Sequence, residues 1–301
     1  MLKIVTGGNG LVGSQFDATY HKLSRNDVDF TRRDETVALF KKLSPEIVIH
    51  TAAKVGGLYS NMQSPADYFE QNLRINTNVL EACRLSGVKK MVGFLSTCIF
   101  PDAVEYPLTE EKIHLGPPHI SNYGYAYAKR MLEVGVQAHN QQYGTHYFCV
   151  IPTNIYGIND NFNLTEAHVI PALIHKVFIA RENKTVLQVP GDGSALREFV
   201  FARDLANIVE MLLEKYEQTS PLIISSGVEI SIKQVLEMIV ELMNYHGKVE
   251  WQTSLSNGQH RKRSDISKLQ DVLPGLRFTG IYEGLKETIN WFESNYAILR
   301  K

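Results

Sequence analysis

Short apolar segments rich in β-branched residues alternate with longer amphipathic segments through the first half of the chain, and this alternation constrains the fold most. The candidates for buried strands are Leu2–Thr6, Tyr20–Leu23, Ile47–Thr51, Met91–Ser96 and His146–Pro152. Two long segments with helical spacing, Tyr68–Ser86 and Tyr125–Tyr143, are each followed by a glycine, which commonly ends a helix. Parallel strands need crossover helices, and right-handed crossovers produce a doubly wound sheet. The sequence therefore predicts an α/β fold around a doubly wound parallel sheet.

A glycine-rich turn follows the first predicted strand directly. Gly7, Gly10 and Gly13 have GxxGxxG spacing, a variant of the dinucleotide-binding fingerprint. Its glycines allow a tight turn, a close approach of backbone to a pyrophosphate, and close packing of helix against strand. Glycine turns also occur where no ligand binds. Only Ser14–Thr19 separates the turn from the second strand, so we expect an unusually short first crossover.

The strict alternation loosens from about residue 162 onward, where loops become richer in glycine and proline. Helical segments are expected there at Ile170–Ala180, Ala202–Lys215 and Ile232–Tyr245. The length of 301 residues allows one large α/β domain or two lobes. We expect residues 1–161, with part of 190–226, to form the cofactor-binding domain. Residues 162–189 and 227–301 are expected to form a smaller C-terminal lobe that binds substrate.

The composition excludes several classes of function and site. The 31 Lys and Arg residues balance 32 Asp and Glu, and the net charge of −1 argues against a nucleic-acid partner. No run of about 18 apolar residues predicts a membrane span, and the N-terminal segment does not resemble a signal peptide. The three cysteines form no CxxC pair and are too few for a disulfide framework. We therefore expect a cytoplasmic protein without a metal site.

The residues after the second predicted strand indicate which dinucleotide the chain uses. An acidic residue at this position favours NAD, whereas a cation accommodates the 2′-phosphate of NADP. Arg25 favours NADP(H), with Ser24 as a second possible contact, but Asp27 lies close enough to leave the choice open. Arg25 could equally be a solvated cation of the loop.

A serine at a strand end and a Tyr-x-x-x-Lys pair form the second set of candidate functional residues. Tyr125 and Lys129 are four residues apart, so both side chains project from one face of a helix. A phenol with a pKa near 10 is a poor acid or base at neutral pH unless an ammonium stabilises its phenolate. Lys129 can supply that charge and also bind a cofactor ribose, while Ser96 can hold a carbonyl oxygen. Cys98 follows Ser96 by two residues, so in an extended segment both side chains emerge on the same side.

Together these motifs resemble the extended short-chain dehydrogenase/reductases, in the branch that modifies nucleotide sugars. Four segments narrow the resemblance to the GDP-L-fucose synthase family, and they are Ala52–Gly57, Ser96–Pro101, Pro152–Phe162 and His168–Ala172. The likeness covers nearly the whole chain. It implies a Rossmann-type domain with a smaller lobe, 3,5-epimerisation of GDP-4-keto-6-deoxy-D-mannose, and NADPH-dependent reduction at C4 to GDP-L-fucose.

The resemblance also implies a role for each catalytic residue. Cys98 is the base and His168 the acid in epimerisation, and Ser96 and Tyr125 polarise the C4 oxygen. Tyr125 then donates a proton to that oxygen during reduction. Spacing alone does not connect His168 with Cys98, and we interpret the two other cysteines as packing residues.

The same resemblance implies the binding residues. The cofactor-binding set comprises Gly7, Asn9, Gly10, Leu11, Val12, Gly13, Arg25, Asp29, Phe30, Ala52, Ala53, Leu95, Ser96, Thr97, Tyr125, Lys129, Pro152, Thr153, Asn154, Ile155 and His168. The substrate-binding set comprises Cys98, Asn154, Lys176, Arg197, Lys262 and Asp265, of which Lys262 is the weaker choice. One departure is Pro190, because the family often has an aromatic residue immediately before the Gly-x-Gly loop. Segments 68–86 and 125–143 resemble the helices that pair two subunits in this superfamily, so we expect a homodimer, although their apolar residues could equally face the sheet.

Two other functions remain open. The first is a nucleotide-sugar 4-epimerase or 4,6-dehydratase of the same fold that holds NAD tightly and recycles it. The second is a cofactor-sensing protein without turnover. A sensor could dispense with Ser96, Tyr125 and Lys129, and their joint presence argues against it.

Overall fold

The computed structural model describes residues 1–255, 259 and 261–299. Its largest sheet has six strands in the order β2-β1-β3-β4-β5-β9, and every neighbouring pair is parallel. The strands are β1 (Lys3–Thr6), β2 (Tyr20–Leu23), β3 (Ile47–His50), β4 (Lys90–Phe94), β5 (His146–Pro152) and β9 (Leu222–Ile224). The predicted doubly wound parallel sheet is confirmed, and its first five strands begin and end within two residues of the predicted ones.

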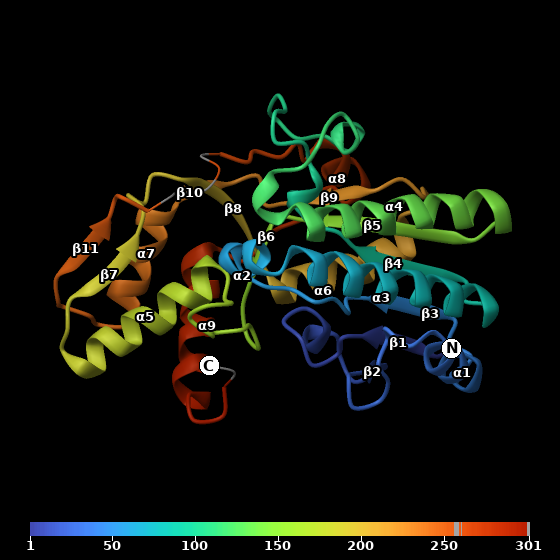
Figure 1. Cartoon of the computed structure of the whole chain (residues 1–301), viewed down its shortest axis with the longest axis horizontal. Coiled ribbons are helices and arrows are strands. Elements are labelled where there is room, and N and C mark those ends of the chain that lie inside the picture. The colour runs from blue at the N-terminus through green and yellow to red at the C-terminus, as the bar shows by residue number, and fades with distance from the viewer. Residues whose placement is uncertain (256–258, 260, 300–301) are drawn as a thin grey trace.

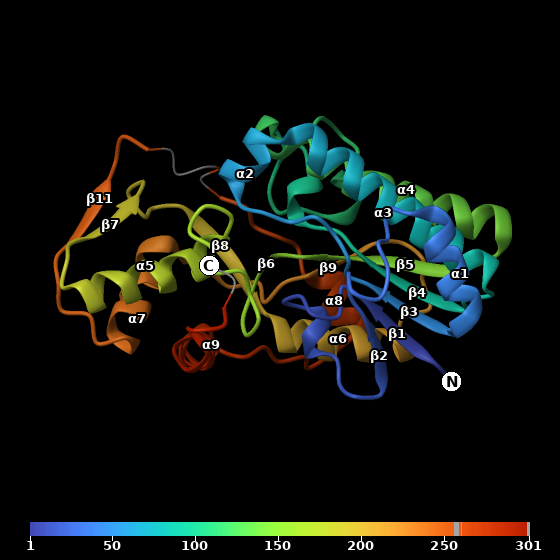
Figure 2. The ribbon, with the colours of Figure 1, turned by 60° about the horizontal axis from the view of Figure 1, so that its bottom comes forward.

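Helices cover both faces of this sheet (Figure 2). The helices on one face are α1 (Arg33–Leu43), α3 (Pro65–Leu85) and α4 (Tyr123–Tyr143), with the short α2 (Leu58–Gln63) before α3. The other face is covered by α6 (Ala202–Lys215) and α8 (Ser267–Val272). Two separate apolar cores result, one against each face, because side chains of a fully buried strand alternate between both faces. Helix α4 ends at Gly144, whose φ of 64° lies in the left-handed region that glycine adopts without strain.

The first crossover is a single 3-10 turn, η1 (Gly13–Gln15), which confirms the short connection predicted between β1 and β2. The space beneath the sheet is filled instead by Val12, Phe16 and Tyr20, all buried in the core that includes α6. Phe16 and Tyr20 pack with their ring centroids 5.1 Å apart. Bulky side chains thus replace a helix that would otherwise bury this part of the sheet.

A smaller group of elements lies to one side of the large sheet (Figure 1). It comprises α5 (Val169–Asn183), α7 (Ile232–Leu242), α9 (Ile281–Asn295), and the parallel pair β7 (Leu187–Pro190) and β11 (Val249–Gln252). A third apolar core holds these elements together. The three-stranded sheet β10-β8-β6 adjoins the two groups, with β6 (Asn154–Tyr156), β8 (Leu196–Phe201) and β10 (Glu229–Ser231).

The division of the chain at residue 162 stays a prediction. Helix α8 belongs by number to the range 227–301, yet its Leu269 packs in the core beneath the large sheet. The remaining short elements are η2 (Thr97–Ile99), η3 (Glu110–Lys112) and η4 (Ile120–Asn122). Within the described ranges, no helix is both long and apolar enough to cross a lipid bilayer.

Candidate active site

The glycine turn after β1 leaves no room for side chains. Gly7 has a φ of 72°, and a Cβ atom there would lie 2.9 Å from the Cα of Ala52. A Cβ atom on Gly13 would overlap the carbonyl oxygen of Gly7. The Gly10 amide donates to the same carbonyl at 2.9 Å, which closes the turn. This cradle at the carboxyl end of β1 matches the shape that a dinucleotide pyrophosphate requires. Of the turn's other predicted residues, Asn9 is exposed, Leu11 is half-buried, and Val12 is buried.

The loop after β2 shows why Arg25 and Asp27 are not equivalent. The Asp27 carboxylate accepts hydrogen bonds from the Ser24 amide at 2.7 Å and the Ser24 hydroxyl at 2.8 Å. These bonds lower the pKa of Asp27 and commit its carboxylate to the turn. Arg25 is exposed and makes no hydrogen bond or ion pair with the part of the chain that the structure describes. The geometry therefore favours a cation, rather than an acid, as the group available to a cofactor ribose.

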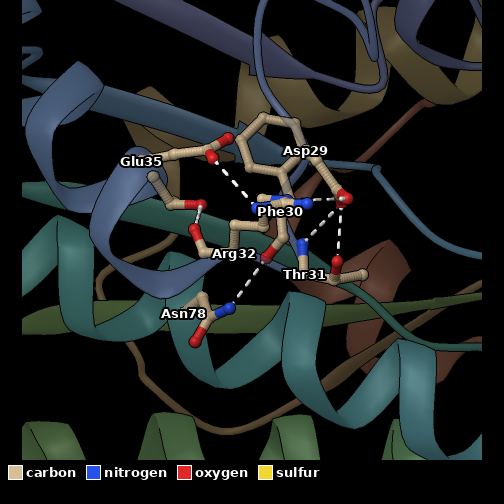
Figure 3. Close-up of polar contacts among 7 residues, drawn as sticks. Asp29, Phe30, Thr31, Arg32, Glu35 and Asn78 are labelled. Atoms are coloured by element: carbon tan, nitrogen blue, oxygen red, sulfur yellow. Dashed lines mark hydrogen bonds and ion pairs between the residues drawn. The ribbon is translucent and has the colours of Figure 1, made fainter.

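Asp29 and Phe30 lie in the loop just before α1, as Figure 3 shows. The Asp29 carboxylate accepts hydrogen bonds from the amide of Thr31 at 2.9 Å and its hydroxyl at 2.7 Å, and lies 3.9 Å from Arg32. The Phe30 side chain is buried in the core, and its carbonyl accepts a hydrogen bond from Asn78 at 2.9 Å. The Phe30 ring therefore does not line a site, and this residue can contact a cofactor only through its backbone.

The segment from Ser96 to Cys98 is not extended, which corrects the geometry expected from the sequence. Ser96 is extended, but Thr97–Ile99 forms a 3-10 turn in which the Ser96 hydroxyl accepts a hydrogen bond from the Cys98 amide at 3.4 Å. The tight turn still keeps the two side chains close enough for the Ser96 hydroxyl to oppose the rise in the pKa of Cys98 that burial causes. Arg130 fixes the turn by donating to the carbonyl of Ile99 at 2.6 Å.

Tyr125 and Lys129 project from α4 toward this turn. The Lys129 ammonium donates to the carbonyl of Phe94 at 2.7 Å and lies 5.8 Å from the centroid of the Tyr125 ring. Burial raises the pKa of Tyr125, with smaller contributions from Cys98 and Tyr68, and lowers that of Lys129 to about 8. The expected lowering of the phenol pKa is therefore absent from the free protein, and Tyr125 is a protonated phenol at neutral pH.

His168 immediately precedes α5 and is exposed to solvent. Partial desolvation of the imidazole nevertheless lowers its pKa. The loop that carries His168 adjoins the loop after β3, because the Gly57 amide donates to the carbonyl of Glu166 at 2.6 Å. A Cβ atom on Gly57 would lie 2.7 Å from the carbonyl of Ala167, so the approach requires glycine.

The remaining predicted cofactor residues follow the central strands. Ala52 and Ala53 follow β3, Leu95 and Thr97 flank Ser96 after β4, Pro152 ends β5, and Thr153, Asn154 and Ile155 come next. The Asn154 amide donates to the carbonyl of Glu198 at 2.9 Å and is committed to β8. The buried hydroxyl of Thr153 has no hydrogen-bond partner within the described residues. An unpartnered polar atom at this sheet edge fits a bound polar ligand.

The predicted substrate cations come from separate elements. Lys176 lies on α5, Arg197 on β8, and Lys262 on the segment before α8, and burial lowers the pKa of each. The Asp265 carboxylate accepts a hydrogen bond from the Ser267 amide at 2.8 Å, so it stabilises the start of α8. Pro190 ends β7 beside β11, where Trp251 lies against Gly193 and places an aromatic ring next to this loop.

A buried chain of polar side chains that the sequence did not indicate connects the glycine turn with α4. The Thr6 hydroxyl lies 2.8 Å from Nδ1 of His50, and Nε2 of His50 lies 3.1 Å from the side-chain oxygen of Asn76. The Asn76 amide donates to the carbonyl of Ala128 at 3.1 Å, one residue before Lys129. Burial, aided by the Lys129 charge, lowers the pKa of His50 to about 3, so the ring is neutral. The sequence signal for this chain of side chains was His50 itself, a histidine in an otherwise apolar strand, because a buried polar group needs a hydrogen-bond partner.

Known proteins resemble this chain over nearly its full length. GDP-L-fucose synthase from Dictyostelium discoideum is 45% identical over 310 aligned positions, which cover 99% of this chain and 97% of that protein. GDP-L-fucose synthase from Escherichia coli K12 is 31% identical, with coverage of 97% and 96%. The structure of a GDP-L-fucose synthetase from Naegleria fowleri bound to NADP matches with a TM-score of 0.93 and 38% identity, covering 100% of this chain and 95% of that one.

The sequence model of the NAD dependent epimerase/dehydratase family matches residues 3–225 of this chain. This range includes the glycine turn, Ser96, Cys98 and the Tyr125–Lys129 pair. Sequence, fold and site geometry thus agree with the resemblance to extended short-chain dehydrogenase/reductases. The chain belongs to the NAD dependent epimerase/dehydratase family.

Proposed function

We propose that this protein converts GDP-4-keto-6-deoxy-D-mannose to GDP-L-fucose, by epimerisation at C3 and C5 followed by NADPH-dependent reduction at C4. One observation carries the proposal. Cys98 follows Ser96 in one tight turn, where its amide donates to the Ser96 hydroxyl, and its thiol interacts electrostatically with both Tyr125 and Lys129, so an additional acid-base group lies within a complete reductase set. Reduction alone has no need of such a thiol. The names of the similar proteins support the same activity.

NADP(H) is the proposed cofactor. The glycine cradle at Gly7 and Gly13 would hold the pyrophosphate, and the exposed Arg25 would bind the 2′-phosphate. Lys129 would bind the nicotinamide ribose beside the carboxyl end of β4. When bound, NADPH supplies the hydride for reduction at C4. The NADP bound to the Naegleria fowleri protein supports this choice.

The epimerisation uses the acidity that the C4 ketone gives to protons on C3 and C5. Removal of either proton leaves an enolate, whose oxygen Ser96 and Tyr125 would stabilise by donating hydrogen bonds. Cys98, once it has lost its own proton to solvent, takes the proton from carbon, and His168, once it has gained a proton from solvent, returns one to the opposite face. Both groups are neutral at rest, because burial raises the pKa of Cys98 and partial desolvation lowers that of the exposed His168.

The reduction uses Tyr125 as its proton donor. Its phenol is protonated at neutral pH, and the Lys129 ammonium beside the ring stabilises the phenolate formed when the proton reaches the C4 oxygen. Lys176 and Arg197 would bind the diphosphate of the substrate. We further propose a cytoplasmic location, where a reducing environment keeps the free thiol of Cys98 intact.

The protein is also proposed to form a homodimer through α3 and α4. These helices expose Phe69, Tyr123 and Met131 around a pocket of about 460 Å³. Pro65, Ala66, Gly124 and Tyr127 complete the pocket wall. A second copy would bury the same apolar surface on each subunit, as two-fold symmetry requires.

Purified protein given GDP-4-keto-6-deoxy-D-mannose should oxidise one NADPH for each GDP-L-fucose formed. The absorbance of the reduced cofactor measures NADPH oxidation, and chromatography measures the product. Tyr125→Phe should lower kcat at least ~100-fold, because the proton donor is lost. Conversion of the sugar without net NADPH consumption would instead favour a 4-epimerase or dehydratase that recycles its cofactor, and the proposal would fail.

Replacing the proposed 2′-phosphate ligand should change the cofactor preference. Arg25→Ala should raise the KM for NADPH about tenfold and leave the KM for NADH unchanged, because one charge-assisted contact is lost. Asp27→Asn serves as the control in the same turn. Equal effects of Arg25→Ala on both cofactors would remove Arg25 from the phosphate site.

Charges placed in the proposed interface should dissociate the dimer. Sedimentation velocity should give twice the chain mass of 34.0 kDa for the wild type and the single mass for Phe69→Glu with Met131→Glu. Lys41→Glu, exposed on α1, should remain dimeric. A wild-type protein that sediments as a monomer at micromolar concentration would refute the interface.

A further inference from the structure

Lys129 is held at the tip of its side chain, and neighbouring side chains also hold its backbone. The ammonium donates to the carbonyl of Phe94 at 2.7 Å. A lysine side chain is long and flexible, so the place where the ammonium meets a ligand depends also on where α4 puts the backbone. Helix α4 lies beside α3 over one face of the large sheet (Figure 2). The contacts that α3 makes with this part of α4 therefore affect the site.

A side chain of α3 binds the peptide group that contains the Lys129 nitrogen. The Asn76 side chain donates to the carbonyl of Ala128 at 3.1 Å, and this carbonyl shares one planar peptide group with the nitrogen of Lys129. A carbonyl only accepts hydrogen bonds, so the nitrogen of the Asn76 amide faces α4. Its oxygen faces Nε2 of His50, at 3.1 Å. The orientation of the Asn76 amide is thus determined by the backbone of α4.

The orientation of this amide determines the tautomer of His50. The Asn76 oxygen only accepts, so in the neutral ring Nε2 of His50 carries the proton and Nδ1 does not. Nδ1 then accepts from the Thr6 hydroxyl, 2.8 Å away, and that hydroxyl accepts from the Ala52 amide at 3.2 Å. Every hydrogen bond in this Thr6–His50–Asn76 network therefore runs in one direction, from a backbone amide at one end to a backbone carbonyl at the other.

The network is shielded from water. Thr6 and His50 are fully buried, and Asn76 is 1% exposed. Burial, aided by the Lys129 charge, lowers the pKa of His50, so the ring keeps a single proton at neutral pH. A protonated ring would carry a proton on Nδ1 and could not accept from Thr6. Buried hydrogen bonds are strong and an unpartnered member is costly, so the network resists displacement of either end.

The network begins at the floor of the glycine turn. Thr6 ends β1 and pairs in register with His50, which ends β3. Gly7 follows, and a Cβ atom there would lie 2.9 Å from the Ala52 nitrogen that donates to Thr6. The network therefore connects the cofactor cradle with the peptide group of Lys129, through side chains of β1, β3 and α3.

We propose that His50 and Asn76 are positioning residues for Lys129, and that the network holds the Lys129 backbone at a fixed place relative to the glycine turn so that both contact one dinucleotide. This role rests on the proposed function, which assigns the glycine turn to the pyrophosphate of NADPH and Lys129 to its nicotinamide ribose. The network moves no proton, because it ends on a carbonyl that has none to pass on. His50 and Asn76 act on cofactor binding only through Lys129.

The test is the affinity for NADPH in the absence of sugar, with the Kd obtained from the change in NADPH fluorescence on titration. Asn76→Leu removes the donor to Ala128 at similar side-chain volume and should raise the Kd about tenfold, because the charge-assisted contact of Lys129 is misplaced. Lys129→Met should raise the Kd by about the same factor. The double variant should bind like Lys129→Met alone, since a positioning residue has no effect once the group that it positions is absent.

Asn78→Leu is the matched control. Asn78 lies on the same helix, is buried, and donates to a different backbone carbonyl, that of Phe30, at 2.9 Å. Its replacement removes a comparable hydrogen bond of α3 without touching the network. The factor by which Asn78→Leu changes the Kd should therefore be the same in the presence and in the absence of Lys129→Met.

The other end of the network provides a rescue. Thr6→Val removes the hydroxyl that donates to His50 at nearly constant volume and should weaken NADPH binding as Asn76→Leu does. Thr6→Ser keeps the hydroxyl and should match the wild type. Thermal melts verify that each variant is folded, and His50→Leu, which breaks the network at its centre, replaces Asn76→Leu if the latter unfolds.

A folded Asn76→Leu variant with the wild-type Kd would overturn the proposal. Independent effects would overturn it as well, with the double variant binding NADPH about a hundredfold more weakly than the wild type. An unchanged Kd in Lys129→Met would remove Lys129 from the cofactor site, and the positioning role with it. The titration contains no sugar, so failure of the turnover assay, which would reject the proposed function, is distinguishable from failure of the network.

Discussion

Two charge-assisted hydrogen bonds from consecutive residues of α4 define the site on which the rest depends. Lys129 donates to the carbonyl of Phe94, at the end of β4, and Arg130 donates to the carbonyl of Ile99, at the end of the following 3-10 turn. The intervening segment contains Ser96 and Cys98. Both donor side chains are buried. Leaving a buried donor without its hydrogen-bond partner lowers the free energy of unfolding by about 1–3 kcal/mol, and by more for a charged group. The helix that carries the proton donor thus fixes the segment that carries the serine and thiol, and the two halves of the proposed chemistry have one rigid frame.

The resting charges of the site follow from its burial. Tyr125 is a protonated phenol and Cys98 a thiol because burial raises the pKa of both, and partial desolvation lowers the pKa of His168, which is a neutral imidazole. Transfer of the phenol proton leaves a phenolate, which the Lys129 ammonium 5.8 Å from the Tyr125 ring centroid favours.

The sequence predicted the features that local spacing determines. The five strands of the first half, the short first crossover and the pairing of Tyr125 with Lys129 all follow from periodicity and glycine positions. Features set by tertiary contacts were not predictable in this way. The 3-10 turn at Cys98 depends on an anchor from α4, and the position of the segment before α8 depends on Glu198 and Leu108, which are distant from it in sequence. His168 was associated with this site only through family resemblance, because no spacing connects it with the other residues.

The central claim is that one thiol, held beside a reductase set, removes the protons at C3 and C5. Incubation of the keto sugar in deuterated water without NADPH isolates this step from reduction, and NMR measures the deuterium entering each carbon. We expect Cys98→Ser to slow incorporation at both carbons at least ~100-fold, because a hydroxyl is a far weaker acid than a thiol and cannot replace the base. Incorporation at the wild-type rate in a folded Cys98→Ser variant would contradict it.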